Sequence, residues 1–381
     1  MSLPQSTLRA ARAPIAAFAA MGLCWGSFAA ELPDLKGMLA IDESRLGLVL
    51  FGTPMAAVLA MLGAAWIARR FGRRALAVTT LGMCAAFALP GLVPVWYLFP
   101  LAMMACGAGT GVTDVLMNAR TAAIEAQLSR SLMNLAHAAY SFGYAGGALM
   151  VGVLRTQGLP PPVVMLAVAL ASGALALLTL EPDGRIEGLD RPRGRGAARL
   201  GLVPMVGGLM VLLAFMAENA AENWSALHIE QTLHGSPAAG SAGPATIALT
   251  MGLARLAGQR LAARIPPLHL ILGGGVLGTL GALVVALAPG PVVAYLGLIL
   301  LGAGTSVISP TAFTLVGQNV PAGLRARAVA RATMVGYFGY FIGPPVLGVI
   351  AGSYGLRFAF VFAAMLVALN MALSPALARR G

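Results

Sequence analysis

Asp114 stands in the middle of a long apolar run, and Asn118 follows it one helical turn later. A carboxylate at membrane depth costs about 2.5–3.5 kcal/mol even on a lenient insertion scale, so it normally faces a partner or a water-filled cavity. Because a buried carboxylate can bind and release a proton, we expect Asp114 to be a proton-binding residue. The alternative is a structural hydrogen bond between helices, with Arg120 or Asn134 as the partner.

His137 is a second candidate for proton binding, because an unperturbed imidazole titrates near neutral pH. Asn134, His137 and Ser141 recur at helical spacing and therefore share one face, which makes Asn134 and Ser141 candidates for polar contacts to a bound molecule. The alternatives are a histidine that only packs, and soft-metal binding by His137 with Met133 one turn away. Methionine and histidine do not cluster further on that face, so no metal site is expected.

Glu218 and Glu222 are four residues apart and share a helix face, with Asn219 beside them. Two carboxylates this close do not both ionise readily, so one can hold a proton. We therefore expect Glu218, the deeper of the two, to bind a proton and Asn219 to contact a bound molecule. The alternative is a solvated pair at the wet end of the helix, where Trp224 would anchor the chain at the lipid interface.

Trp25 and Phe28 lie in the first apolar run and could stack on a sugar ring. Packing of the two rings inside the protein is the alternative. The three cysteines, Cys24, Cys84 and Cys106, also lie in apolar runs, without metal-type spacing, and are expected to be small packing residues.

The composition places these residues in membrane-spanning helices. The chain has 381 residues, of which 59% are hydrophobic and only 10% charged, whereas a soluble domain carries roughly 25% charged residues. Its apolar runs are near the roughly 20 residues that a spanning helix needs, and backbone in lipid must satisfy its own hydrogen bonds. The sequence predicts an all-α membrane protein with twelve spans, at residues 14–36, 46–68, 75–94, 96–119, 132–154, 161–180, 203–226, 241–262, 269–288, 291–315, 328–350 and 355–376.

The net charge of +12 comes from basic residues that fall mainly on one side of these twelve spans. Of the 25 Lys and Arg residues, the side that carries both termini holds all except Lys36, Arg45, Arg155 and Arg357, hence 25 − 4 = 21. The positive-inside rule then places both termini in the cytoplasm. This distribution also explains the basic balance without a nucleic-acid partner.

An internal repeat divides the chain into two halves. Gly107-Ala-Gly-Thr recurs at Gly302, an offset of 302 − 107 = 195, and the segments 142–152 and 338–348 are similar at an offset of 196. We expect a six-helix bundle at residues 1–180, a cytoplasmic linker at 181–202 and a second bundle at 203–381. In such parallel repeats the solute site lies between the halves near the membrane midplane.

The turn after the second predicted span resembles a signature of the major facilitator superfamily. Arg70, Gly72, Arg73 and Arg74 match the signature, and Arg260 is retained in the corresponding turn of the second half. This resemblance implies that these residues form a cytoplasmic gate motif. Arg69 and Gln259 stand where the family has acidic residues. In the family these acids help to close the cytoplasmic side when the transporter faces outward, and this chain lacks them at both positions.

Further segments resemble a poorly characterised bacterial branch of the superfamily near the fucose permeases. They are residues 114–118, 132–137, 222–225 and 343–345. The resemblance implies a transporter of the bacterial inner membrane that works by alternating access. Because acidic residues such as Asp114 lie deep in its apolar helices, we expect proton-coupled symport of a small polar solute, a sugar or a related compound. Glu31 stands where a basic residue is expected, which bears on the choice of substrate. The expected solute contacts are Asn118, Asn134, Ser141, Asn219, Trp25, Phe28 and Glu31.

Other functions fit the sequence less well. A proton-coupled efflux antiporter for drugs or metabolites would carry Gly-Pro in the fifth span, where this chain has Gly146-Gly147. A membrane enzyme would need a nucleophile–base pair or a metal cluster, and neither is evident. A sensor that transports nothing is a further alternative. We expect a monomer in the bilayer that needs no cofactor, ATP or metal; the sequence leaves the solute and the direction of transport open.

Overall fold

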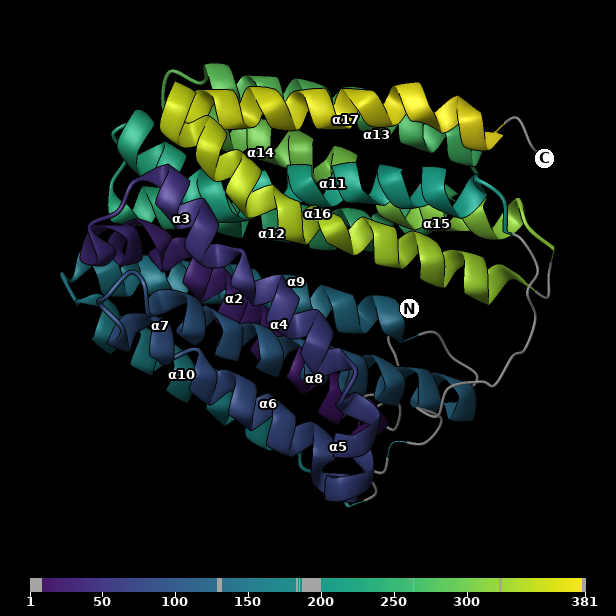
Figure 1. Ribbon diagram of the computed structural model, residues 1–381, viewed down its shortest axis with the longest axis horizontal. Helices are drawn as coiled ribbons and strands as arrows, with labels where there is room; N and C mark the ends of the chain where they lie inside the picture. Colours follow the sequence, from purple (N-terminus) through teal and green to yellow (C-terminus); the bar gives the residue numbers. More distant parts are fainter. Residues whose placement is uncertain are drawn as a thin grey trace. The chain divides into compact units, whose positions relative to one another are not determined.

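The computed structural model describes residues 9–128, 132–182, 184, 186, 200–262, 264–321 and 324–378, without the side chains of 258–262, 326 and 378. All regular secondary structure in these residues is helical (Figure 1). The chain divides into two compact units. Unit 1 comprises Met1–Ile41 and Val49–Arg193, and unit 2 comprises Asp42–Leu48 and Gly194–Gly381.

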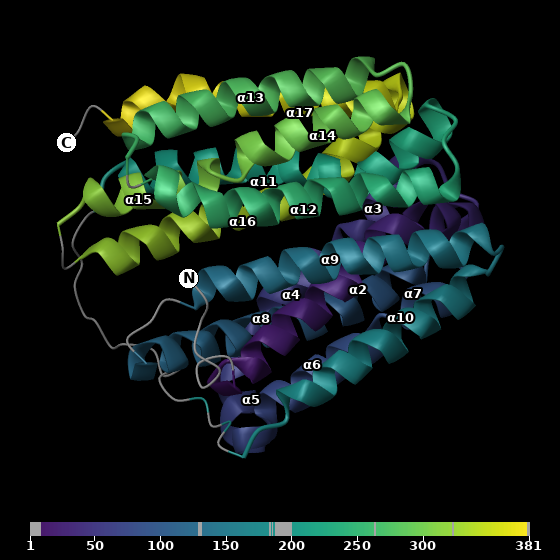
Figure 2. The same cartoon turned by 180° about the vertical axis from the view of Figure 1, so that it is seen from behind.

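Unit 1 is built from long helices joined by short turns, coloured purple to blue-green in Figures 1 and 2. Its elements are α2 (Arg12–Leu39), α4 (Gly52–Met61), α5 (Ala64–Phe71), η1 (Gly72–Arg74), α6 (Ala75–Ala86), α7 (Leu89–Leu92), α8 (Phe99–Leu128), α9 (Met133–Thr156), α10 (Pro161–Ala176) and η2 (Leu177–Thr179).

Unit 2 has a similar construction. Its elements are α11 (Val203–Leu227), the π-helical turn η3 (His228–Thr232), α12 (Pro237–Ala262), α13 (Pro267–Leu287), α14 (Pro291–Thr305), α15 (Ile308–Gln318), α16 (Arg325–Tyr354) and α17 (Leu356–Ala378). It also takes most of α3 (Glu43–Leu50), where Ser44 Oγ donates to the Gly348 carbonyl of α16 at 3.4 Å. That grouping is not predicted from the sequence.

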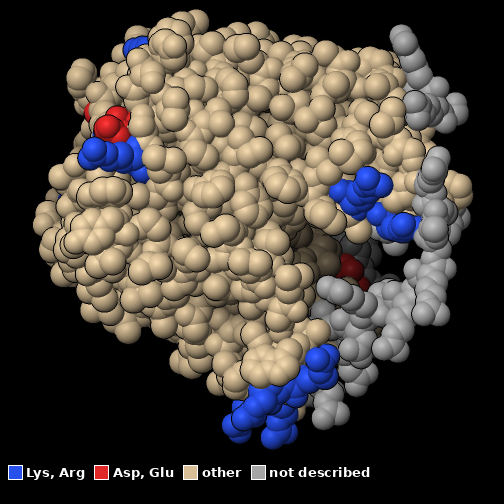
Figure 3. All heavy atoms as spheres, viewed as in Figure 1, with Lys and Arg blue, Asp and Glu red and all other residues tan. Residues whose placement is uncertain are grey.

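Ten helical segments of the described chain are long and apolar enough to cross a membrane. The more polar α9, with 24 residues, and α12, with 26, stand at the two other predicted positions. At 1.5 Å per residue each is longer than the roughly 30 Å hydrocarbon core. Ten and two account for the twelve predicted spans, so the all-α membrane fold is confirmed. Charged side chains are sparse on the face in Figure 3.

Small residues let α2 and α9 of unit 1 pack closely. A methyl group added at Gly26 would overlap the Tyr144 carbonyl of α9, and one at Gly147 would overlap the Leu23 carbonyl of α2. In unit 2, Gly339 of α16 has the same relation to the Leu212 carbonyl of α11. Such glycines allow helix backbones to approach in a membrane, where packing rather than hydrophobic burial holds helices together. The pairs α2–α9 and α11–α16 therefore position most of the predicted polar residues.

Candidate polar sites on the two units

Asp114 lies near the middle of α8, in unit 1, and is half-buried. Asn118 donates through Nδ2 to Asp114 Oδ1 at 3.0 Å and to the Asp114 carbonyl at 2.8 Å. The predicted one-turn spacing therefore produces a direct contact that holds the carboxylate in place. Arg120, an alternative partner from the sequence, donates instead to Glu181 Oε1 through Nε at 2.8 Å.

Arg120 and Glu181 form an ion pair that the sequence did not predict. Their side chains are only 10% and 14% exposed. The pair joins the second half of α8 to the chain that follows η2, where Arg12 of α2 also donates to the Leu180 carbonyl at 2.6 Å. The start of the predicted linker is therefore packed against unit 1, and its residues 183, 185 and 187–199 lie outside the described residues.

α8 continues to Leu128, beyond the predicted end of the fourth span at residue 119. Glu125 Oε1 accepts hydrogen bonds from the backbone nitrogens of Leu132 and Met133, the latter at 2.7 Å. Free N–H groups at a helix start attract a carboxylate. Glu125 therefore fixes the start of α9, which carries the next set of polar residues.

Asn134, His137 and Ser141 all lie on α9, as the helical spacing predicts. The His137 ring meets the edge of the Phe18 ring of α2 with their centroids 4.9 Å apart. Ser141 is buried, and Asn134 and His137 are half-buried. Proton binding by His137 and solute binding by Asn134 and Ser141 stay predictions.

Trp25 and Phe28 both lie on α2 and contact one another edge to face at 5.8 Å. Trp25 Nε1 donates to Thr110 Oγ1 of α8 at 3.2 Å, and its ring also meets Phe87 at 5.1 Å. Phe28 is 1% exposed. The aromatic packing that the sequence left as the alternative is thus present, and stacking on a solute stays a prediction.

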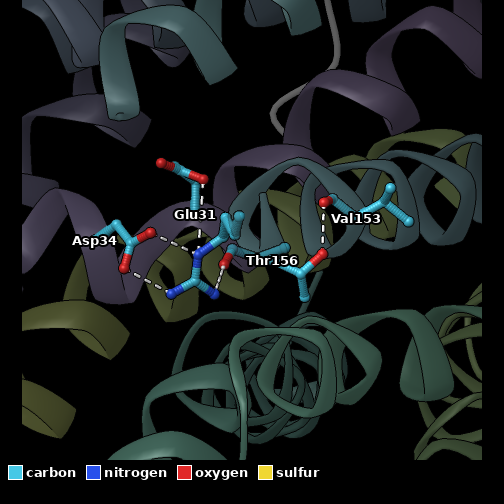
Figure 4. A network of polar contacts seen from close by, with 6 residues as sticks. Glu31, Asp34, Val153 and Thr156 are labelled. Carbon is cyan, nitrogen blue, oxygen red and sulfur yellow. Dashed lines mark hydrogen bonds and ion pairs between the residues drawn. The ribbon is translucent and has the colours of Figure 1, made fainter. Parts of the chain in front are cut away.

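Two carboxylates and one guanidinium form a network between α2 and α9 (Figure 4). Arg155 donates through Nε to Asp34 Oδ2 at 2.8 Å and through Nη2 to Asp34 Oδ1 at 2.7 Å. Its Nη1 donates to the Ala30 carbonyl at 2.9 Å, and Glu31 Oε2 stands 3.9 Å from Nε. The side chains of Arg155 and Glu31 are fully buried, whereas that of Asp34 is 38% exposed.

The sequence could not reveal this network, because 121 positions separate Arg155 from Asp34. The distribution of basic residues placed Arg155 only on the side opposite the termini. Glu31, an expected solute contact, lies beside the guanidinium. Its contact with solute stays a prediction.

In unit 2, Glu218 and Asn219 lie on α11 and are 3% and 5% exposed. The charge of Arg255, on α12, acts on both Glu218 and the half-buried Glu222. A methyl group on Gly343 would lie 3.5 Å from Asn219 Oδ1, which places Asn219 against α16.

The prediction that Trp224 anchors the chain at the lipid interface is wrong, because its side chain is fully buried in unit 2. The neighbouring turn carries His228, which is also buried and contacts the Val285 carbonyl of α13 through Nε2 at 3.1 Å. The C-terminal part of α11 and the turn η3 are therefore packed inside unit 2 rather than at a lipid interface.

Four of the predicted gate residues, Arg70, Gly72, Arg73 and Arg74, lie at the tight turn between α5 and α6. Gly72 has φ 54° and ψ −126°, a backbone conformation that favours glycine. Arg70, Arg73 and Arg74 are exposed there, and basic side chains gather over α5 in Figure 3. The carbonyl of Arg73 approaches Gly184 so closely that a methyl group on Gly184 would overlap it. Arg260 lies on α12, where its side chain is outside the described part of the chain.

The described residues contain no group of three or more His, Cys, Asp or Glu side chains able to hold a metal ion. Cys24, Cys84 and Cys106 are buried free thiols.

Comparison with known proteins gives a result that agrees with the sequence motifs. The sequence profile of the Major Facilitator Superfamily matches residues 15–341 and 207–380. An uncharacterized MFS-type transporter of Yersinia pestis is 29% identical over 359 residues, which cover 92% of this chain and 91% of that protein.

Two solved structures share the fold at low sequence identity. A bacterial homolog of the human lysosomal transporter Spinster has a TM-score of 0.76 and 14% identity, over 100% of this chain and 98% of its own. The transporter FucP has a TM-score of 0.58 and 18% identity, over 97% and 99%.

Proposed function

Because the chain belongs to the major facilitator superfamily, whose members are membrane transporters and not generally enzymes, we propose that it carries a small polar solute by proton-coupled symport. The proposed solute is a sugar or a related compound, and the proposed mode of action is alternating access in the cytoplasmic membrane. The solved relatives support the fold only, since both are less than 25% identical to this chain. The proposal therefore depends on the polar residues of this chain.

The observation that carries the proposal is the Asp114–Asn118 pair. Asp114 is the sixteenth of the 30 residues of α8, and its carboxylate accepts a hydrogen bond from Asn118. An acidic side chain at such a depth is a functional-site candidate by default, because its burial must be offset. A proton on Asp114 removes the charge, so a loaded transporter can change conformation without moving an unpaired charge through an apolar region.

Other residues supply the remaining parts of the mechanism. In unit 1, Asn118, Asn134 and Ser141 offer amide and hydroxyl groups to a polyhydroxylated solute, and His137 is a second group that can hold a proton. In unit 2, Asn219 would bind solute and Glu218 would hold a proton. The charge of Arg255 acts on Glu218. The roles of Trp25, Phe28 and Glu31 as solute contacts belong to the same proposal.

We propose that both termini face the cytoplasm and that the protein acts as a monomer. The support is the distribution of basic residues, with 21 of 25 on the side that carries the termini. The proposed organisation is two bundles, at 1–180 and 203–381, joined by a linker at 181–202. Arg70, Gly72, Arg73, Arg74 and Arg260 would form the cytoplasmic gate motif.

The first experiment identifies the solute. Purified protein is screened by thermal shift against sugars, sugar acids, nucleosides, peptides and drugs, and each stabilising compound is then tested for uptake into proteoliposomes. Accumulation driven by an imposed pH gradient, acid outside, supports symport. Accumulation only with the gradient reversed would contradict symport and support a proton-coupled efflux antiporter.

A further inference from the structure

Arg155 is shared by two carboxylates that differ in their surroundings. Asp34 takes both the Nε and Nη2 donors at 2.8 and 2.7 Å and is 38% exposed. Glu31 is fully buried and stands 3.9 Å from Nε. The three groups would carry a net charge of −1 if all were ionised, and a buried unbalanced charge is costly. A proton on Glu31 would leave a balanced pair of Arg155 and Asp34.

The helices restrict where the guanidinium can go. Its Nη1 donates to the Ala30 carbonyl, one residue before Glu31, so the arginine head lies level with both acids. Pro33, between the acids, has no N–H and leaves the Ala29 carbonyl without its usual helical donor. Ser27, one turn before Glu31, has a buried hydroxyl with no hydrogen-bond partner, and it faces Gly147 of α9.

We propose that Glu31 is a proton-binding residue whose protonation decides which carboxylate Arg155 holds. When a proton from water neutralises Glu31, Arg155 pairs with Asp34, as the structure shows. When Glu31 loses the proton, Arg155 turns to the buried Glu31, and water solvates the half-exposed Asp34. No covalent bond other than the O–H bond of the carboxyl group forms or breaks.

Other titratable residues lie on α2 and on the helices packed against it. Asp34 and Lys36 lie beside Glu31 on α2, and α10 carries no titratable residue. The other titratable residues on the long helices packed against α2 are His137, Tyr140, Tyr144, Cys84, Cys106, Asp114, Arg120 and Glu125. Arg155 Nε lies 3.9 Å from Glu31 Oε2, within ion-pair range.

Infrared difference spectroscopy of the full-length protein in lipid nanodiscs tests this proposal without any solute. The carbonyl stretch of protonated carboxylic acids is measured at one fixed pH. We expect Glu31→Gln to lose the part of the band due to Glu31. Asp34→Asn should lose the same part, because Arg155 then keeps Glu31 as its anionic partner and holds it ionised. Arg155→Gln should retain it.

Asp114→Asn is the matched control and should leave the Glu31 part of the band in place. A band unchanged in Glu31→Gln, or fully retained in Asp34→Asn, would overturn the proposal. Both substitutions preserve side-chain shape, and size-exclusion profiles and helical circular dichroism report whether the variants are folded. Since no transport is measured, the outcome is independent of whether Asp114 couples protons to solute.

Discussion

At the scale of single residues, the carboxylates of this chain have hydrogen-bond and ion-pair partners of different kinds. Asp114 receives an amide donor from its own helix, Glu181 pairs with Arg120, and Asp34 receives both branches of Arg155. Glu31 and Glu218 are the most deeply buried of the described acids and lie near shared cations. Glu181 and Asp34 form ion pairs with Arg120 and Arg155, whereas Asp114, Glu31 and Glu218 are the acids proposed to exchange a proton.

The Arg120–Glu181 pair should stabilise unit 1. Removal of one partner leaves a nearly buried charge without its counterion, so Arg120→Gln and Glu181→Gln should each lower the unfolding temperature in detergent. The double variant should lose less than the sum, with a coupling energy of about 0.5–3 kcal/mol. Additive losses would show that the two side chains do not interact in the folded protein.

Residue spacing was enough to predict which side chains share a helix face. The one-turn spacing placed Asp114 and Asn118 on one face, and the structure shows a hydrogen bond between them, although the partners considered from the sequence were Arg120 and Asn134. Arg155 meets Asp34 only through the packing of two helices that are far apart in sequence, and no local pattern reports that. Trp224 was misassigned for the same reason, since burial depends on the helices around α11.

At the scale of elements, the close pairing of α2 with α9 positions the network and the His137 face. Adjacent glycines of α9 allow a controlled test of this pairing. A methyl group on Gly147 would overlap the Leu23 carbonyl, whereas one on Gly146 meets nothing within 4 Å. Both substitutions gain the same helix propensity, about 1 kcal/mol for alanine over glycine.

Gly147→Ala should therefore destabilise the protein, by about 1–3 kcal/mol as overpacking does, and Gly146→Ala should be neutral or stabilising. Thermal unfolding followed by tryptophan fluorescence measures both. If the two variants behave alike, the separation of α2 and α9 does not depend on a glycine at position 147.

The elements themselves were largely predictable, because apolar runs of membrane length must form helices. The residues at which the helices end were less predictable. The sequence ended the fourth span at 119, whereas α8 continues to Leu128 through a polar turn whose Glu125 binds the start of α9. Likewise, the repeat indicated two halves, but no sequence feature predicted that Asp42–Leu48 groups with unit 2.

At the scale of the whole molecule, composition and charge distribution support a multi-pass membrane transporter with a defined orientation. Single cysteines can test the proposed orientation, since the three native cysteines are buried. Gln157→Cys, at the exposed turn after α9, should react with a membrane-impermeant maleimide in intact cells. Arg73→Cys, in the basic turn at η1, should react only after permeabilisation. The reverse pattern would place the termini outside.

The central claim is that a proton on Asp114 couples solute movement to the pH gradient. The direct measurement is accumulation, in proteoliposomes under an imposed pH gradient, of the solute that the thermal-shift screen identifies. Wild-type protein should concentrate the solute and lose the accumulated solute when a protonophore is added. Asp114→Asn should equilibrate the solute across the membrane without concentrating it. Full accumulation by Asp114→Asn would contradict the claim.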